Sequence, residues 1–539
     1  MEKRIYAGNY TALQLIGRKL GAQGLVCLTC GNGTREQTAL RAQRWEHLYF
    51  RLTPGEVYRL VWENAELPYA YLLGQENGDP EICFLPLEPG CLEEQEIRSR
   101  YHFSPIRGWL NDPNGLCSFG GQYHMFYQFN PGDQHWGNMH WGHAVSPDLL
   151  HWKHLSIARF PQQELMDLPE LRGGAYSGTA LPDGDMLHLF YTRHIGDNAR
   201  TWCREWTVHA STRDGLHFSG EEELVVQLPP ELETDFRDPK VLRLGEQWVM
   251  LTGGRSGETP VVAIHTSADR THWEYGGIFY REEDPQYRQA ECPDLIPMGG
   301  EYILIVGYHN RPGVSNQMRR DVVWYRGSIE NLRFCVSYHG LMDYGKDYYA
   351  TQSVAGTDIV LGWNSDYTQT YRELPGGANG TMSLPRKLFI RDGKLCSFPI
   401  AAVSTLERQW RMLQGITVAE GSCHIRVNAA ENSCWHLLLA ESEKGELSLE
   451  CREGRGYLRV WEETLLLPEG VPLGQVDVYL DRSLVEIFLN GGSAALTRRF
   501  RARKVTYPVC FTLSQGTGEA AMAEMENTMR VIEQTNPAL

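Results

Sequence analysis

Hydrophobic and polar positions in the middle of the chain follow one pattern that recurs four times. Each segment has an apolar alternating strand, a connector, a second strand and a turn that an aromatic residue closes. The four closing aromatics are Trp152, Phe218, Trp273 and Phe334, and a fifth unit is predicted over residues 348–390. A repeat of about 40 to 65 residues with several strands per unit is typical of a β-propeller, in which radial repetition leaves only short strand edges.

The strand that opens each unit is expected to be the innermost one, so the residues at its start should face a central channel. These openings are Asn111–Asp112, Tyr176–Gly178, Arg237–Asp238, Glu291 and Tyr348–Ala350. Acids that recur at one position of a repeated unit can converge on a common axis. The same pattern has an alternative interpretation, a large β-sandwich in which these polar residues only cap the starts of strands.

The regions on either side do not fit the repeat. Strand-like runs and turns in residues 1–94 predict a small N-terminal β domain of unknown role. Residues 95–400 are assigned to the propeller, and 401–412 to a linker with a short helix near 403–410. Short strands in 413–539, with a hairpin signal at Asn490–Gly491, predict a C-terminal β-sandwich. The predicted fold is therefore all-β: a five-bladed propeller followed by a sandwich, with an additional N-terminal β domain.

Composition limits the classes of function. The 539 residues carry a net charge of −16 with no basic stripe, so neither nucleic acid nor an anionic membrane is an expected partner. No segment has the roughly 18 apolar residues of a membrane-spanning helix, and the N-terminus has no apolar secretory core. Thirteen cysteines, an odd and scattered set, indicate reduced thiols and a cytoplasmic protein.

Three segments place a carboxylate close to a proline at the start of a strand. They are residues 109–115, 236–240 and 291–295, which carry Asp112, Asp238 and Glu291. Enzymes that cleave a glycosidic bond typically use two carboxyl groups that lie on either side of it. Asn111 and Asn114 could donate hydrogen bonds that keep Asp112 ionised, whereas like-charge repulsion from Asp112 and Asp238 is expected to raise the pKa of Glu291. An Asp before Pro is otherwise ordinary turn chemistry.

These three blocks, in this order, resemble the signature blocks of glycoside hydrolase family 32, which contains invertases, sucrose-6-phosphate hydrolases, levanases and inulinases. The resemblance extends to Asp481–Phe488 in the tail, covers about residues 98–535 and leaves the N-terminal domain unexplained. It implies a retaining enzyme built as a five-bladed propeller plus a sandwich. By position, Asp112 is implied to be the nucleophile that attacks C2 of the fructosyl unit, and Glu291 the acid and base. Asp238 is implied to hold fructose hydroxyls and to stabilise the transition state.

By the same resemblance, further residues are implied to shape the fructose pocket: Trp109, Asn111, Gln128, Trp136, Ser177, Arg237 and Trp363. Each also has a structural interpretation, since Gln128 could cap a strand, Ser177 could lie in a turn and Trp363 could fill a blade core. A different group, His135, His140 and His143, does not have the spacing of a zinc site and is interpreted as core or interface histidines. Neither a metal nor a cofactor is expected.

The resulting hypothesis is an intracellular retaining β-fructofuranosidase that hydrolyses sucrose or short fructo-oligosaccharides through a covalent fructosyl-enzyme. A fructosyltransferase, or an exo-acting fructanase on inulin or levan, could use the same acids. An inverting pentose-releasing enzyme on a similar propeller would need more widely separated carboxyls. The alternative of another class is a carbohydrate-binding protein with a catalytically dead site.

Several properties stay open at the level of sequence. The leaving group could be glucose, glucose 6-phosphate or a fructan chain, because the loops that contact it have no sequence motif by which one of these could be recognised. Linkage preference, the ratio of hydrolysis to transfer, and oligomeric state, a homo-oligomer included, are open as well. The expected partner is a small fructoside.

Overall fold

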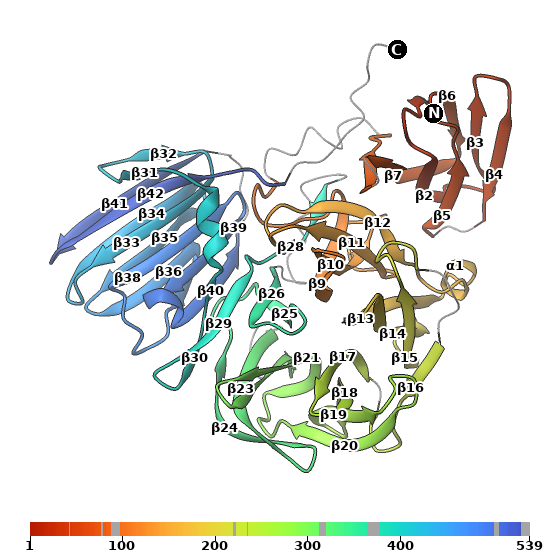
Figure 1. Cartoon of the computed structure of the whole chain (residues 1–539). Coiled ribbons are helices and arrows are strands. Elements are labelled where there is room, and N and C mark those ends of the chain that lie inside the picture. The colour runs from red at the N-terminus through yellow and green to blue at the C-terminus, as the bar shows by residue number, and fades with distance from the viewer. Residues whose placement is uncertain are drawn as a thin grey trace.

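The structure is a computed structural model that describes residues 1–41, 44–76, 79–87, 98–218, 223–233, 235–311, 320–364, 377–500 and 506–529. β-Strands dominate these residues, and the α-helix α1 (Glu164–Asp167) is about one turn long. Within the described ranges, the strands form nine sheets, which make up three units along the chain (Figure 1). The all-β fold class expected from the sequence is confirmed.

Five of the sheets are arranged radially around one axis, as the blades of a β-propeller (Figure 1). Blade I consists of β9 (Gly108–Phe119), β10 (Gln122–Asn130), β11 (His140–Ser146) and β12 (Lys153–Arg159). Blade II consists of β13 (Leu171–Asp183), β14 (Met186–Asp197), β15 (Cys203–Thr212) and β16 (Glu223–Gln227). Blade III consists of β17 (Arg237–Leu244), β18 (Gln247–Ser256), β19 (Thr259–Ser267) and β20 (Glu274–Arg281).

Blades IV and V complete the ring. Blade IV consists of β21 (Tyr287–Met298), β22 (Glu301–Asn310), β23 (Arg320–Glu330) and β24 (Arg333–Leu341). Blade V consists of β25 (Tyr349–Ser353), β26 (Ile359–Asn364), β29 (Arg386–Arg391) and β30 (Lys394–Pro399), and β28 (Thr381–Met382) pairs with β26.

A short strand from the last blade closes the ring onto the first. β27 (Ala378–Asn379) lies in the connection between β26 and β29, and it pairs in parallel with β9 of blade I. Ala378 lies opposite Gly108, and Asn379 lies opposite Trp109. The start of the strand that carries Asp112 is therefore held by a segment that comes much later in the chain.

Two of the aromatic residues that close the repeated turns pack onto the preceding blade. Phe218 of blade II lies edge-on to Phe126 of blade I, with ring centroids 5.8 Å apart. Trp273 of blade III makes the same contact with Phe190 of blade II at 5.9 Å. The pattern that predicted the repeat therefore reflects the contacts that join neighbouring blades.

The opening strand of every blade has an irregular register near its start. The shifts fall between Leu110 and Pro113, Ala175 and Gly178, Arg237 and Lys240, Glu291 and Asp294, and Tyr349 and Gln352. Within these segments Asp238, Cys292 and Ala350 adopt positive φ angles of 64°, 48° and 51°. A bulge re-aims side chains, and a non-glycine residue in this region of φ costs on the order of 1–3 kcal/mol. Part of the backbone strain in the described chain therefore lies close to the axis of the propeller.

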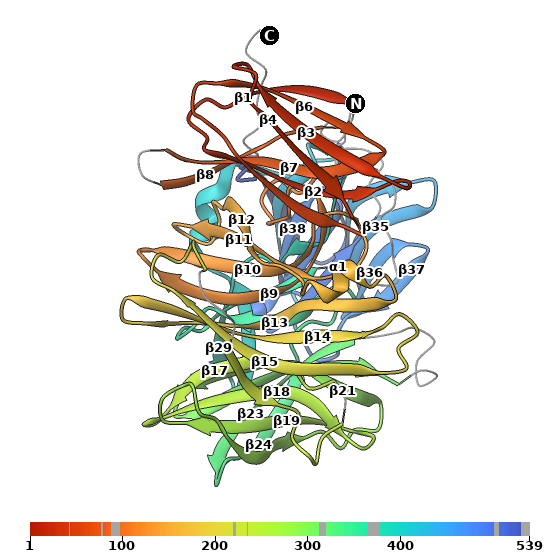
Figure 2. The same ribbon diagram turned by 90° about the vertical axis from the view of Figure 1, so that its right-hand side faces the viewer.

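The N-terminal unit is a pair of four-stranded sheets that packs on blade I, as Figure 2 shows. One sheet has the order β1 (Glu2–Tyr6), β6 (Val57–Glu63), β3 (Gly24–Cys30) and β4 (Arg35–Leu40). The other has the order β5 (Glu46–Arg51), β2 (Ala12–Lys19), β7 (Ala65–Glu76) and β8 (Asp79–Phe84). Tyr69 of β7 lies edge-on to Phe129 of β10 at 5.7 Å, so the unit and blade I share one hydrophobic core.

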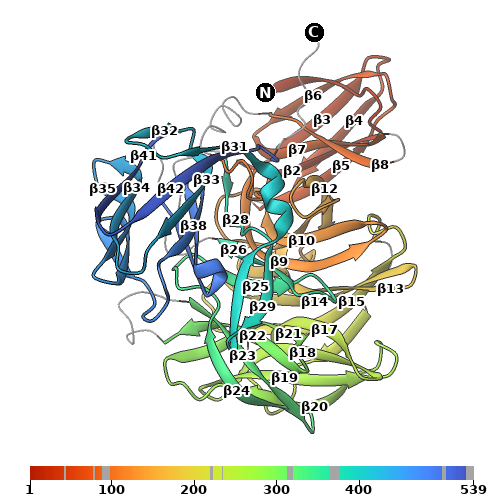
Figure 3. The ribbon, with the colours of Figure 1, turned by 60° about the vertical axis from the view of Figure 1, so that its left-hand side comes forward.

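The C-terminal unit is a sandwich of two six-stranded sheets on the flank of blade V (Figure 3). The first has the order β31 (Glu407–Met412), β42 (Gly518–Met525), β33 (Ser422–Ala429), β38 (Gln475–Asp481), β39 (Leu484–Leu489) and β40 (Ala494–Arg499). The second has the order β32 (Thr417–Ala419), β41 (Tyr507–Gln515), β34 (Cys434–Ser442), β35 (Gly445–Arg452), β36 (Arg455–Trp461) and β37 (Glu463–Leu466). The predicted turn at Asn490–Gly491 forms the 3-10 helix η3 (Asn490–Gly492) and joins β39 to β40.

Residues 401–412, assigned to the linker, contain the 3-10 helix η2 (Ala401–Leu406) in place of the longer helix expected there. They also contain β31, which pairs with β42 of the sandwich.

A buried ionic network joins the propeller to the sandwich. His102 lies with Nδ1 3.0 Å from Asp481 Oδ2 and Nε2 3.1 Å from Glu486 Oε1, and Arg386 of blade V also binds Glu486 at 2.7 Å. Burial alone would lower the pKa of His102, but its hydrogen bonds to the two carboxylates, and their charges, raise it to about 9. The two units are therefore held together by paired charges as well as by apolar packing.

Two further observations concern the described part of the chain. Its twelve cysteines are all free. It contains no helix that is both long and apolar enough to cross a membrane.

Candidate active site

A cavity of about 880 Å³ lies at the axis of the propeller and is lined by residues from all five blades. Asp112 comes from blade I, Ser177 from blade II, Asp238 from blade III, Glu291 from blade IV and Tyr349 from blade V. The three acids singled out in the sequence are thus brought to one cavity by the openings of three different blades. The register shifts at the starts of β9, β17 and β21 fall at these same residues.

Asp112 is partly buried and accepts hydrogen bonds at both carboxylate oxygens. Ser177 Oγ donates to Oδ2 at 2.6 Å, and Asn111 Nδ2 donates to Oδ1 at 3.0 Å. Trp109 Nε1 donates to Asn111 Oδ1 at 2.7 Å and so fixes the amide that holds Asp112. Burial raises the pKa of Asp112, and the bonds from Ser177 and Asn111 offset part of that rise.

Asn114, which was expected to donate a second amide hydrogen bond to Asp112, has a different position. It lies behind Ser177, with its amide 3.2 Å from Ser177 Oγ. The side chains of a strand alternate between its faces, but the irregular register of β9 changes which residues share a face. The second donor to Asp112 is therefore Ser177 of the neighbouring blade.

Asp238 is buried beside Cys292. Its Oδ2 accepts from the backbone N–H of Cys292 at 3.0 Å, and its own N–H donates to Thr192 Oγ1 at 3.1 Å. Burial, and then the charge of Glu291, raise the pKa of Asp238. In the free site, burial and the charge of Glu291 therefore favour the neutral form of Asp238.

Glu291 is surrounded by donors. Arg237 Nη2 donates to Oε1 at 2.8 Å and Gln289 Nε2 donates to the same oxygen at 3.0 Å, while Tyr349 OH donates to Oε2 at 2.8 Å. His309 Nε2 lies 2.7 Å from Oε2. Burial alone would raise the pKa of Glu291, but the charges of His309 and Arg237 hold it well below its usual range.

The expectation that neighbouring acids raise the pKa of Glu291 is therefore wrong for the free site. The charges of His309 and then of Arg237, both in direct contact with the carboxylate, outweigh the effects that raise its pKa. Burial lowers the pKa of His309, so its charge is available only in acid. At neutral pH it is Arg237 that keeps Glu291 ionised.

Cys292 connects two of the acids and was assigned no role from the sequence. Its Sγ lies 3.6 Å from Asp112 Oδ2 and 3.5 Å from Asp238 Oδ2. Burial and the nearby carboxylates raise the pKa of this thiol well above its ordinary value, so it is a neutral donor. Cys292 has a positive φ and lies in the register shift of β21, and no pattern of residue types in the sequence indicated this placement.

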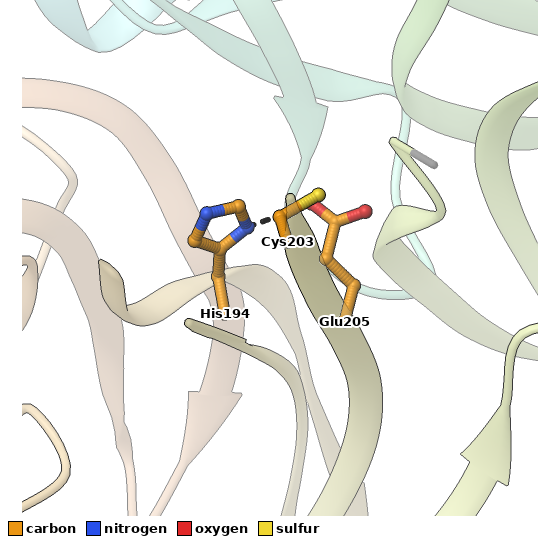
Figure 4. A group of neighbouring side chains, drawn as sticks. All are labelled: His194, Cys203 and Glu205. Atoms are coloured by element: carbon orange, nitrogen blue, oxygen red, sulfur yellow. Dashed lines mark hydrogen bonds and ion pairs between the residues drawn. The ribbon is translucent and has the colours of Figure 1, made fainter. Parts of the chain in front are cut away.

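A second group missed in the sequence is Glu205 with His194 and Cys203 (Figure 4). Glu205 Oε1 accepts from Arg237 Nη1 at 2.8 Å and lies 3.0 Å from His194 Nδ1. In the part of the chain that is described, it is the one group whose ligand atoms lie close enough together, within 4.8 Å, to hold a metal. The direct contact of the Arg237 cation with Glu205 opposes a second cation there. The group serves instead to orient Arg237.

The remaining residues predicted for the pocket divide into two layers. Asn111, Gln128, Trp136, Ser177 and Arg237 line the cavity. Trp109 and Trp363 are buried behind it, edge-on to each other at 5.6 Å. Those two rings support the wall without reaching the cavity.

The three histidines that could have suggested a metal lie in separate environments. His135 is exposed and pairs with Asp133, and His140 lies edge-on to Phe160. His143 stacks on Phe126 inside the blade. Burial lowers the pKa of His140 to about 3 and that of His143 well below its ordinary value, so both are neutral.

A cavity that presents three carboxyl groups at the axis of a five-bladed propeller with an attached β-sandwich defines a glycoside hydrolase. The family model described as "Glycosyl hydrolases family 32 N-terminal domain" matches residues 102–399. The chain belongs to glycoside hydrolase family 32.

Individual relatives agree with this assignment. A sucrose-6-phosphate hydrolase of Escherichia coli is 32% identical over 74% of this chain and 88% of its own length. A raffinose invertase of Escherichia coli is also 32% identical, with the same two shares. Both similarities extend over most of the relative, so they concern whole enzymes.

Solved structures extend the comparison to the N-terminal unit. A family 32 glycoside hydrolase of Bifidobacterium adolescentis superposes with a TM-score of 0.88 at 27% identity, over 98% of this chain and 100% of that one. A β-fructofuranosidase of Bombyx mori superposes with a TM-score of 0.73 at 27% identity, over 81% of this chain and 95% of that one. The former match is too extensive to omit the N-terminal sheets, so this unit also occurs in another member of the family.

Proposed function

We propose that this enzyme is a retaining β-fructofuranosidase that hydrolyses sucrose and short fructosides. The observation that carries the proposal is the convergence of Asp112, Asp238 and Glu291 on one cavity. Two relatives are named as a sucrose-6-phosphate hydrolase and a raffinose invertase, and these names support fructosides as the substrate class.

In this proposal Asp112 is the nucleophile. Ser177 and Asn111 stabilise its ionised form through two hydrogen bonds, although burial opposes ionisation. Attack on C2 of the fructosyl unit forms a covalent ester and expels the leaving sugar, and water then hydrolyses the ester with retained configuration.

Glu291 is the proposed acid and base, which requires it to gain a proton when substrate binds. Fructose hydroxyls that donate to Asp238 favour its ionised form, and a leaving oxygen that accepts from Glu291 favours the neutral form of that carboxyl. Binding of substrate therefore shifts the balance of protonation from Asp238 toward Glu291. The three carboxyls titrate as a coupled set, and Asp238, once ionised, stabilises the positive charge of the transition state.

Two measurements test the reaction. The first is release of fructose from sucrose, sucrose 6-phosphate, an inulin-type trisaccharide, inulin and levan, with Asp112→Ala as the negative control. The second is NMR of the fructose first released, in which the β-anomer is expected because two displacements restore the configuration. An initial α-anomer would point to inversion, and longer oligosaccharides formed at high sucrose would point to transfer.

A cytoplasmic location belongs to the same proposal. It is supported by the free state of all twelve described cysteines, several of which are buried where oxidation would disturb packing. Fractionation of cells that express the protein would test it.

A further inference from the structure

Trp202 is an exposed tryptophan on the wall of the active-site cavity. It lies in the connection between β14 and β15 and is 48% exposed to solvent. The same segment also brings Asp197, Arg200 and Thr201 to the cavity. None of these four residues takes part in the reaction proposed above.

Trp202 differs from the other tryptophans in what covers its ring. Among the residues that the structure describes, every other tryptophan is either buried in a core, as Trp62 is, or packs on a second ring or on an arginine. Trp410 shows this for a surface position. It is 39% exposed, but His424 lies edge-on to it at 5.0 Å and the Arg426 guanidinium lies 4.8 Å from its ring centroid. Within the described chain no such group covers Trp202, so its ring is open to a ligand.

The backbone that carries Trp202 is fixed by Asp197. The two carboxylate oxygens of Asp197 accept from Thr201 N at 2.7 Å, from Thr201 Oγ1 at 2.6 Å and from Trp202 N at 3.2 Å. Asp197 N in turn donates to the carbonyl of Trp202 at 3.3 Å. A ring on a segment that is already ordered loses little further freedom when a ligand stacks on it.

The depth of the cavity indicates which part of a fructoside would reach this ring. Asp238 is only 4% exposed, so the fructosyl group, which must meet the acids, lies deep in the cavity. Trp202 is far more exposed and therefore lies nearer to the solvent. The part of the substrate that extends outward from the fructosyl group is the sugar that leaves.

A chain of contacts also places Trp202 on the side of the proposed acid. Trp202 directly precedes β15, in which Glu205 lies beside Cys203 and His194 (Figure 4). Glu205 binds Arg237 Nη1 at 2.8 Å, and Arg237 Nη2 binds Glu291 at 2.8 Å. Because Glu291 is proposed to protonate the leaving oxygen, the sugar attached to that oxygen lies toward this wall.

We propose that Trp202 is a stacking platform for the leaving sugar, with Arg200 beside it as a donor to the hydroxyls of that sugar. The C–H groups of a pyranose give it an apolar face that packs well on a flat aromatic ring. A few polar groups around such a ring then fix the orientation of the ligand. This inference rests on the proposed fructosidase activity and adds a residue that selects fructosides in which fructose is joined to a sugar ring.

The experiment compares kcat/KM for sucrose and for methyl β-D-fructofuranoside, which has the same fructosyl group but no leaving sugar. Both are measured in the full-length parent enzyme, in Trp202→Ala and in Trp202→Phe. The ratio of sucrose to methyl fructoside is expected to fall at least about ten-fold in Trp202→Ala. Trp202→Phe keeps a smaller ring and should recover part of the ratio.

The matched control is Trp410→Ala, since Trp410 is also exposed but lies in β31 of the C-terminal sandwich. Its ratio should equal that of the parent enzyme. Product inhibition gives a second measurement that does not depend on turnover of the methyl fructoside. Glucose should inhibit Trp202→Ala less than it inhibits the parent enzyme, whereas inhibition by fructose should be the same in both.

The outcomes separate this inference from the proposed function. A parent enzyme that hydrolyses neither substrate contradicts the fructosidase proposal itself. Hydrolysis of both substrates with an unchanged ratio in Trp202→Ala overturns only the platform. Equal losses on the two substrates assign Trp202 a structural role and overturn it too. A greater loss on the methyl fructoside, or weaker inhibition by fructose, would place the fructosyl group on Trp202 in place of the leaving sugar.

Discussion

The guanidinium of Arg237 binds Glu291 through two nitrogens, with Nη2 at 2.8 Å and Nε at 3.2 Å from the same carboxylate oxygen. The same arginine also binds Glu205 and Asp235, so its position is fixed from two further sides. If Glu291 acts as the acid, as proposed, it must be released from this contact, or the contact must be outweighed by substrate, before Glu291 can donate a proton. We therefore expect the contact to influence the pH range of the reaction.

We predict that Arg237→Gln moves the alkaline limb of the pH profile of kcat/KM upward. Loss of the guanidinium raises the pKa of Glu291, so the acid form persists to higher pH. The maximum should fall at least about ten-fold, because the variant also positions Glu291 less well. Arg237→Lys, which keeps the charge, is the control and should shift the limb less. An alkaline limb that does not move in Arg237→Gln would show that Glu291 does not titrate there.

Glu291→Gln should lower kcat by about 10²- to 10⁴-fold on sucrose, the range of general acid catalysis. The loss should be smaller on a fructoside with an activated leaving group, which departs without protonation. Gln keeps the volume and can still accept from Arg237, so the fold should be retained, as circular dichroism would check. Equal losses on the two substrates would contradict Glu291 as the acid.

Chemical rescue should distinguish Asp112 from Asp238. Azide or formate is expected to restore part of the activity of Asp112→Ala, because a small anion can replace a nucleophile. Asp238→Ala should not respond, since Asp238 forms no covalent bond in the proposed reaction. The reverse pattern, rescue of Asp238→Ala alone, would exchange the two roles.

The thermal stability of the enzyme should fall in mild alkali because of His102. Its pKa is raised from 6.5 to about 9 in the folded protein. A raised pKa contributes stability that is complete below pH 6.5 and is lost as the pH rises through about 9. The loss is about 3 kcal/mol for this buried group. The Tm of the parent should therefore drop over this interval more than the Tm of His102→Gln, and parallel pH dependences would contradict the assignment.

Polymeric fructans should be poor substrates. The N-terminal unit contributes to a cavity next to the active site, so it limits the space for a long leaving chain. We expect kcat/KM on sucrose or a trisaccharide to be at least about ten-fold higher than on inulin or levan. Initial rates at equal concentrations of fructosyl ends would measure this, and comparable rates on polymers would rule out a restricted entrance.

The sequence could predict those residues of the site whose positions follow from the pattern of a single strand. Asp112, Asp238 and Glu291 each stand at the start of the first strand of a blade, so the repeat alone placed them on one axis. The same reasoning could not assign Ser177 to Asp112, because that contact crosses between blades and depends on the irregular register of β9.

The sequence could not predict the pKa of Glu291 or the cavity between the N-terminal unit and the propeller, because both depend on contacts between distant segments. The pKa of Glu291 depends on the rotamer of Arg237, and a pattern of residue types does not specify it. Arg18 and Trp45 line a cavity together with Arg172 of blade II, because the sheet of β2, β5, β7 and β8 packs on the propeller. The N-terminal sheets themselves pair strands distant in the chain, such as β1 with β6, and residue patterning predicts strands better than it predicts such partners.

Closure of the ring by β27 has a consequence for the order of assembly during synthesis. Gly108 and Trp109 emerge from the ribosome early, but their partners Ala378 and Asn379 come from the last blade. The first four blades can build their own sheets as they appear, whereas the entrance strand of the catalytic cavity stays unpaired on that edge until the fifth arrives. Pairings so distant in sequence form slowly and late. A nascent chain that stops before β27 therefore contains all three acids but not a closed active site.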